Sequence, residues 1–170
     1  MPGQSKETKI TIFCDIDGVL NDNSNMYQKL HTNYDTVASN IREENMVNFK
    51  SLCSQIPHAE IVMSTSWRGF ITLPEWDSLF EFYGIKHRVV GKTLHCAPNL
   101  SSDAYHMRFT DIDDYIKRNG VKFPLALDDF PLHAIPSYKT IGAYGLRKED
   151  VFKILSMIEQ KMFWSRCEKI

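Results

Sequence analysis

The sequence predicts an α/β fold in which a mainly parallel, five-stranded sheet is covered by helices on both faces. Three observations support this prediction. Short apolar runs typical of buried strands alternate along the chain with amphipathic runs of helical period. Three of the apolar runs end abruptly in Asp, Ser or Thr. The 170 residues, 43% of them hydrophobic, are enough for one domain with one core, so we expect a single domain over residues 1–170.

Five runs are predicted as strands because they are rich in β-branched, apolar or aromatic residues and are bounded by turn formers or charged residues. They are residues 9–14, 60–64, 87–91, 124–127 and 140–144. The region 21–39 is rich in Asn, Asp, Ser and Thr without a clear period, so we expect a loop or a small flap there. A second irregular loop is expected over residues 95–106.

Four helices are predicted from apolar residues at helical spacing and from start and stop signals. The first extends from Asn40, as its N-cap, to Pro57. The second begins at Pro74 and ends before Gly84. The third and fourth are expected over residues 110–119 and 148–163. Helices between successive strands are the connections that a parallel sheet requires.

Composition argues against several classes of protein. The formal net charge is -1, so no global field favours nucleic acid or a membrane surface. The polar N-terminus lacks the apolar segment of a secretory signal, and no apolar run reaches the length of about 20 residues that a membrane span needs. The four cysteines show neither a CxxC pair nor zinc-ligand spacing. We therefore expect a cytoplasmic protein with reduced thiols and no membrane partner.

Polar residues follow three of the predicted strands. Asp15 and Asp17 follow the first strand, a hydroxyl cluster starting at Ser64 ends the second, and Asp128 and Asp129 follow the fourth. In open parallel sheets the ligand site lies beyond the carboxyl ends of the strands. Carboxylates crowded together are costly to ionise without a cation, and their hard oxygen atoms suit Mg²⁺. A carboxylate can also attack phosphorus and form an acyl phosphate.

These residues resemble a known family. Asp-Ile-Asp-Gly-Val-Leu-Asn at 15–21 is similar to the first motif of the haloacid dehalogenase (HAD) superfamily, Ser64 to its second, and Leu-Ala-Leu-Asp-Asp at 125–129 to its fourth. The resemblance implies a Rossmann-like three-layer sandwich, a Mg²⁺ cofactor and an Asp nucleophile at position 15. It also implies that Asp17 is the general acid and base, and that its backbone carbonyl helps to hold the metal. Ser64 would hydrogen-bond the phosphoryl group, Asp128 would ligate Mg²⁺, and Asp129 would assist.

The third motif of this superfamily supplies a basic residue, for which the sequence offers two candidates. Arg108 is preferred because it precedes the predicted helix that leads to Asp128. Lys92, just after the predicted third strand, is the alternative. A fixed cation besides the metal is needed because charge develops on the transferring phosphoryl oxygens.

The string Ser-Thr-Ser-Trp-Arg at 64–68 resembles a compact subgroup of the superfamily. That subgroup includes nucleic-acid-repair-type phosphatase domains and small bacterial phosphatases, some of which act on phosphotyrosyl proteins. Thr65, Trp67 and Arg68 are candidates for substrate binding, since an indole can stack on an aromatic substrate and a guanidinium can contact phosphate. Trp67 could instead pack in the core, and Arg68 could pair with Glu75 or Asp77 on the surface. The short spacing between motifs leaves room only for a minimal cap.

The function expected from these features is a phosphomonoester hydrolase that works through an aspartyl phosphate. An open site would admit bulky phosphorylated substrates, and a phosphotyrosine protein is slightly favoured. A polynucleotide end or a small metabolite is the alternative substrate. Nucleic acid is not favoured, because its binding relies on clustered Lys and Arg. A non-catalytic interaction domain with the same fold is the rival from another class.

Overall fold

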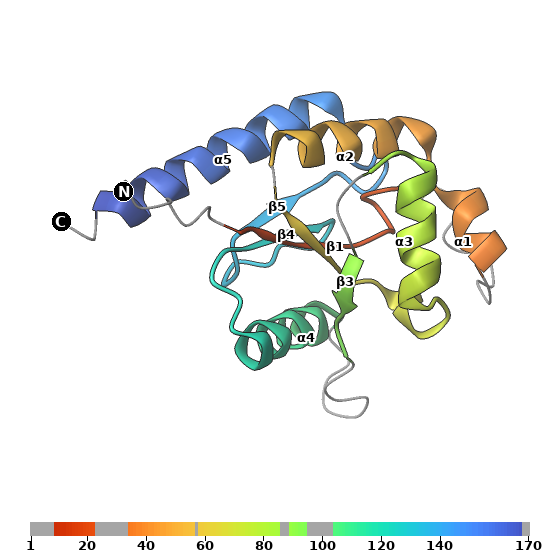
Figure 1. Ribbon diagram of the computed structural model, residues 1–170, viewed down its shortest axis with the longest axis horizontal. Coiled ribbons are helices and arrows are strands. Elements are labelled where there is room, and N and C mark those ends of the chain that lie inside the picture. Colours follow the sequence, from red (N-terminus) through yellow and green to blue (C-terminus); the bar gives the residue numbers. More distant parts are fainter. Residues whose placement is uncertain (1–8, 23–33, 57, 86–88, 95–103, 168–170) are drawn as a thin grey trace, which may run out of the picture.

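The computed structural model describes residues 9–22, 34–56, 58–85, 89–94 and 104–167 (Figure 1). It contains a five-stranded sheet with the order β3-β2-β1-β4-β5, in which every neighbouring pair is parallel. The strands are β1 (Thr11–Cys14), β2 (Glu60–Met63), β3 (Val89–Lys92), β4 (Pro124–Asp128) and β5 (Ser137–Lys139). The predicted α/β fold with a mainly parallel five-stranded sheet is therefore confirmed, and it is the architecture expected of a HAD-like domain.

The register of the central strands aligns their carboxyl ends. Cys14, the last residue of β1, pairs with Met63 of β2 on one side and with Leu127 of β4 on the other. The next residue along each chain segment is Asp15, Ser64 or Asp128. Because parallel strands point the same way, these three residues emerge side by side at one edge of the sheet.

Helices cover both faces of the sheet. The helices α2 (Glu43–Gln55) and α5 (Lys148–Cys167) lie on one face, and α4 (Ala104–Asn119) lies on the other (Figure 1). Side chains of β1 alternate between the two cores. Ile12 and Cys14 belong to the larger core cluster with α2 and α5, whereas Phe13 packs with Ile112 of α4. Both layers are thus anchored to the same central strand.

The helix α3 (Leu73–Phe82) forms where its sequence signals predict. Thr72 and Glu75 form a capping box, in which the Thr72 backbone N–H donates to Glu75 Oε2 at 2.7 Å. Pro74 lies in the first turn, where its missing N–H has no cost. Gly84 follows the helix with a φ of 71°, a left-handed conformation that glycine adopts most easily.

The first predicted helix is wrong in its boundaries. The chain forms two helices, α1 (Tyr34–Asn40) and α2, and Asn40 ends the first instead of capping the second. The N-cap of α2 is Arg42, whose extended backbone separates the two helices and whose guanidinium pairs with Asp22. Residues 23–33 of the predicted 21–39 flap lie outside the described residues, and residues 34–40 form α1.

Two larger differences from the predicted boundaries occur later in the chain. The predicted fifth strand at 140–144 is wrong, because β5 occupies the preceding residues and 141–145 form a turn closed by an antiparallel bridge. Ile141 and Tyr144, which suggested a strand, are 50% and 59% exposed in this turn. The helix α4 begins at Ala104, six residues before the predicted start, and residues 95–103 of the predicted loop lie outside the described residues.

Two further observations bear on the expected class of protein. Cys14 and Cys53 are buried free thiols. Burial raises the pKa of Cys53 to about 12, so this thiol is kept protonated and unreactive. Within the described ranges, none of the helices is long and apolar enough to cross a membrane.

Candidate active site

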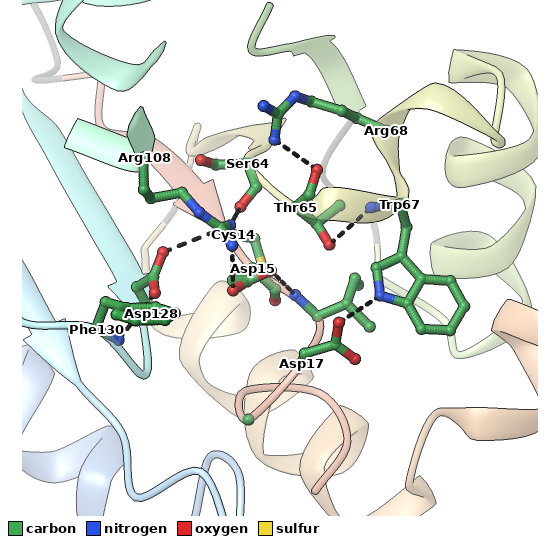
Figure 2. A network of polar contacts seen from close by, with 12 residues as sticks. Cys14, Asp15, Asp17, Ser64, Thr65, Trp67, Arg68, Arg108, Asp128 and Phe130 are labelled. Atoms are coloured by element: carbon green, nitrogen blue, oxygen red, sulfur yellow. Dashed lines mark hydrogen bonds and ion pairs between the residues drawn. The ribbon is translucent and has the colours of Figure 1, made fainter. Parts of the chain in front are cut away.

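Acidic and basic side chains converge beyond the carboxyl ends of β1, β2 and β4 (Figure 2). Asp15 is 1% exposed, and its Oδ2 lies 3.1 Å from Nη2 of Arg108. The other terminal nitrogen of Arg108 lies 3.6 Å from Oδ2 of Asp128 and also donates to the backbone carbonyl of Ser64. Arg108 therefore links residues at the carboxyl ends of the three central strands.

The electrostatics of this cluster are unusual because its charges are almost fully buried. Burial raises the pKa of Asp15, although the Arg108 guanidinium and the Ile16 backbone N–H act in the opposite direction. Burial followed by repulsion from Asp15 raises the pKa of Asp128 to about 7. For Arg108, burial disfavours the cation, but Asp15 and Asp128 outweigh it and raise the pKa of Arg108 above its usual range. The single guanidinium of Arg108 thus faces two buried carboxylates, those of Asp15 and Asp128.

Three carboxylates fit a divalent metal ion. Ligand oxygens of Asp15, Asp128 and Asp129 all lie within 4.8 Å of one another. Oδ2 of Asp128 is buried and has no hydrogen-bond partner among the described residues, and the nearby guanidinium of Arg108 lies 3.6 Å away. A buried acceptor of this kind is costly unless a cation binds it. Hard oxygen donors of this kind suit Mg²⁺. The donor set and the unsatisfied oxygen are therefore consistent with the magnesium site expected from the sequence.

Gly18 explains how Asp129 approaches the loop after β1. Its φ is 71°, and a Cβ atom at this position would lie only 2.7 Å from Oδ2 of Asp129. The hydroxyl of Thr140 donates to the Gly18 carbonyl at 2.6 Å and so attaches the residues after β5 to the same loop. Any other side chain at Gly18 would push Asp129 away from the other carboxylates.

Asp17 lies apart from the three grouped carboxylates. The indole N–H of Trp67 donates to its Oδ2 at 2.6 Å (Figure 2). The Asn21 amide donates to Oδ1 of Asp17 at 2.9 Å. Asp17 is partly exposed, unlike the buried Asp15. Its carboxylate is therefore held by protein donors at the edge of the site, which leaves only its backbone carbonyl as the expected metal ligand.

Ser64 presents a hydroxyl to the cluster. The residue is 1% exposed, and its Oγ has no hydrogen-bond partner among the described residues. Its backbone N–H donates to the Cys14 carbonyl, which fixes the residue beside β1. A buried hydroxyl without a partner is available for an oxygen atom of a bound group.

The two candidate basic residues occupy different places. Arg108 lies in the second turn of α4 and contacts both Asp15 and Asp128. Lys92, at the end of β3, donates to the backbone carbonyls of Arg68 and Ile71, at 2.7 and 3.3 Å. The structure thus brings Arg108 into the carboxylate cluster, whereas Lys92 stabilises the turn after β2.

Thr65, Trp67 and Arg68, the candidates for substrate binding, all lie inside the protein. All three are at most 5% exposed. Thr65 caps the 3-10 helix η2 (Ser66–Gly69) through its side chain, and the Trp67 indole contacts Asp17. Arg68 forms a buried ion pair with Asp111 of α4, not a surface pair with Glu75 or Asp77. Their polar groups bind protein partners and hold the site together.

Two contributing residues were not predicted. Asn21 lies within the first motif, and its amide could have been assigned to Asp17 because a turn brings residues four apart together. Asp111 follows Arg108 by three residues on α4, and this spacing places both on one helix face. The spacing of three residues from Arg108 could therefore have indicated that Asp111 lies near the site.

Asp128 should make the stability of the metal-free protein depend on pH. Its folded-state pKa is raised from 3.8 to about 7, so between these values the folded state binds a proton that the unfolded state has lost. The free energy of unfolding should therefore fall from about pH 4 to about pH 7. In EDTA, the midpoint of thermal unfolding should be lower near pH 7.5 than near pH 5.5. Asp128→Asn should reduce this difference, and an undiminished difference in the variant would contradict the assignment.

A family model described as the HAD domain in Swiss Army Knife RNA repair proteins matches residues 11–151. The matched segment extends from β1 into α5 and includes every residue of the cluster described above. No curated protein and no solved structure matches the chain. The match supports a hydrolase of the HAD type. Since it covers well over half of the sequence, the chain belongs to the family of HAD domains found in Swiss Army Knife RNA repair proteins, within the haloacid dehalogenase superfamily.

Proposed function

We propose that this protein is a Mg²⁺-dependent phosphomonoester hydrolase that removes a terminal phosphate from RNA through an aspartyl phosphate on Asp15. The observation that carries the proposal is the environment of Asp15. Its carboxylate lies 3.1 Å from the buried Arg108 guanidinium and within the group formed with Asp128 and Asp129. The Ser64 hydroxyl, which has no hydrogen-bond partner in the described part of the chain, lies at the end of the neighbouring strand.

In the first step, a carboxylate oxygen of Asp15 attacks phosphorus, and the bond to the leaving oxygen breaks. Asp17 supplies a proton to that oxygen. Arg108 and the Ser64 hydroxyl hold the phosphoryl oxygens, on which negative charge is spread. Mg²⁺, held by Asp15, Asp128, Asp129 and the Asp17 carbonyl, would offset the charge that the carboxylates and the phosphate bring together.

In the second step, water attacks the aspartyl phosphate and releases inorganic phosphate. Asp17, now ionised, takes a proton from that water. The nucleophile is regenerated, and the two steps need no other side chain to change its protonation state. The separation of roles follows from burial, because Asp15 is enclosed beside a cation whereas Asp17 lies at the partly exposed edge.

The choice of RNA as substrate comes from the family, whose description names RNA repair proteins. Exposed rings at the same sheet edge are compatible with it, since bases can stack on aromatic side chains. Phe130, 37% exposed, donates its backbone N–H to Asp128, and Tyr144 is 59% exposed in the turn after β5. The phosphotyrosyl protein that the sequence favoured, a small metabolite and a non-catalytic role are the competing interpretations.

A substrate panel tests the proposal. Purified protein should release phosphate from p-nitrophenyl phosphate with Mg²⁺ and lose this activity in EDTA. Oligoribonucleotides with a 3′- or 5′-phosphate should be dephosphorylated with a higher kcat/KM than phosphotyrosyl peptides or sugar phosphates. Asp15→Asn is the matched control for contaminating phosphatase. A preference for phosphopeptides would replace the RNA assignment, and no release from any substrate would support the non-catalytic domain.

A further inference from the structure

We propose that Trp67 is a positioning residue that holds the Asp17 carboxylate in place for proton transfer. The inference rests on the proposed function, because it assigns a role to a residue that acts through the Asp17 carboxylate and not on the phosphate itself. In this proposal Trp67 is a buried hydrogen-bond donor that acts through Asp17. The sequence had suggested that it binds substrate directly.

Both oxygens of Asp17 accept a hydrogen bond from a buried residue. Trp67 Nε1 donates to Oδ2 at 2.6 Å, and Asn21 Nδ2 donates to Oδ1 at 2.9 Å. Trp67 is 2% exposed and Asn21 is 6% exposed. Two donors on opposite oxygens fix the rotation of a carboxylate that one donor alone would leave free to turn.

Each donor is itself held in place. Trp67 lies in the 3-10 helix η2, where its backbone N–H donates to the Thr65 hydroxyl at 3.4 Å, and its ring belongs to the larger core cluster. The side-chain carbonyl of Asn21 accepts from the Gly18 N–H at 3.0 Å. The donors are thus built into two different turns, one after β2 and one after β1, that meet at Asp17.

The two proton transfers explain why Asp17 needs hydrogen-bond donors on both of its carboxylate oxygens. Asp17 has to give a proton to the leaving oxygen and then take one from water, so it must keep one position through both steps. An indole N–H only donates, and it leaves the second lone pair of Oδ2 for the reacting proton. Displacement of a catalytic group by about 1 Å can cost on the order of 10²-fold in rate. Loss of either donor should therefore slow proton transfer more than it weakens phosphate binding.

Trp67→Phe tests the role because it keeps a buried aromatic ring and removes the N–H. We expect its kcat/KM for phenyl phosphate, whose leaving group needs a proton, to fall about tenfold or more. Single-turnover phosphoryl transfer from p-nitrophenyl phosphate should change less than about threefold, since that leaving group needs little protonation. Asn21→Ala, which removes the second donor, should show the same selectivity.

Trp76→Phe is the matched control. Trp76 is also fully buried, in α3, and its indole N–H has no hydrogen-bond partner among the described residues. This variant should lose stability without any selectivity between the two leaving groups. In Asp17→Asn, the further change Trp67→Phe should have almost no kinetic effect, because a residue that acts through Asp17 cannot matter once that carboxylate is gone.

The contact itself has a readout that does not depend on turnover. In ¹⁵N-labelled protein, Asp17→Asn should shift the indole N–H resonance of Trp67 and leave that of Trp76 unchanged. Equal losses for both leaving groups in Trp67→Phe, additive effects in the double variant, or an unshifted resonance would each overturn the positioning role while leaving the proposed hydrolase intact. Absence of turnover in the unmodified protein would overturn both proposals.

Discussion

Asp15→Asn should reduce phosphate release by at least about 10³-fold, since loss of a covalent nucleophile costs orders of magnitude. The amide has nearly the same shape, but it is not a competent nucleophile toward phosphorus. The position is enclosed, with 1% of the residue exposed and Arg108 at 3.1 Å. Water is therefore poorly placed to substitute for the missing carboxylate. The measurement is the steady-state rate with p-nitrophenyl phosphate and with a phosphorylated oligoribonucleotide at saturating Mg²⁺.

The fold of Asp15→Asn should remain intact, and this separates chemistry from stability. Burial, with a smaller contribution from the Asp17 carboxylate, makes the charged form of Asp15 costly, as its raised pKa indicates. The neutral amide removes that cost, so the metal-free variant should unfold at a temperature no lower than the unmodified protein. Acid quench of the unmodified protein with labelled substrate should trap label on Asp15, whereas the variant should trap none. A variant that keeps more than about a tenth of the original rate would rule out the nucleophile role.

The positions of Asp15, Ser64 and Asp128 could be predicted because they depend on strand order and register alone. Asp15 and Ser64 directly follow β1 and β2, Asp128 is the last residue of β4, and parallel pairing brings these strand ends together. Such information is local in the sequence, since it needs only the last residue of each strand. The same reasoning explains why the α/β class and the five-stranded sheet could be predicted although several boundaries were wrong.

Contacts between distant turns could not be predicted. Trp67 and Asp17 are 50 residues apart, and Arg68 and Asp111 are 43 residues apart. The partners of a long side chain depend on rotamers and on the way the turns pack, which no periodic pattern encodes. Arg68 shows the consequence, because a guanidinium in a turn suggested a surface pair although it is buried against α4. The position of β5 and the start of α4 differ from expectation for the related reason that boundaries depend on tertiary packing.

Arg108→Ala should reduce kcat/KM by about 10²-fold or more, by analogy with the loss of one preorganised charge-stabilising donor. The guanidinium is the cation that contacts Asp15, Asp128 and the Ser64 carbonyl, so it can hold phosphoryl oxygens beside the nucleophile. Its removal also leaves two buried carboxylates with one cation fewer, so the variant should reach half-saturation at a lower Mg²⁺ concentration. Titration of Mg²⁺ against initial rate measures both effects.

Lys92→Ala is the matched control for Arg108→Ala. Lys92 donates to the Arg68 and Ile71 carbonyls, and both of these groups belong to the turn after β2. Its loss should lower the unfolding temperature while changing kcat/KM by less than about fivefold, since the charge does not reach the phosphoryl site in the structure. Arg108→Lys should recover only part of the activity, because an ammonium cannot contact both carboxylates in the forked geometry of a guanidinium. A large kinetic defect in Lys92→Ala beside a near-normal Arg108→Ala would transfer the role of phosphate-binding cation to Lys92.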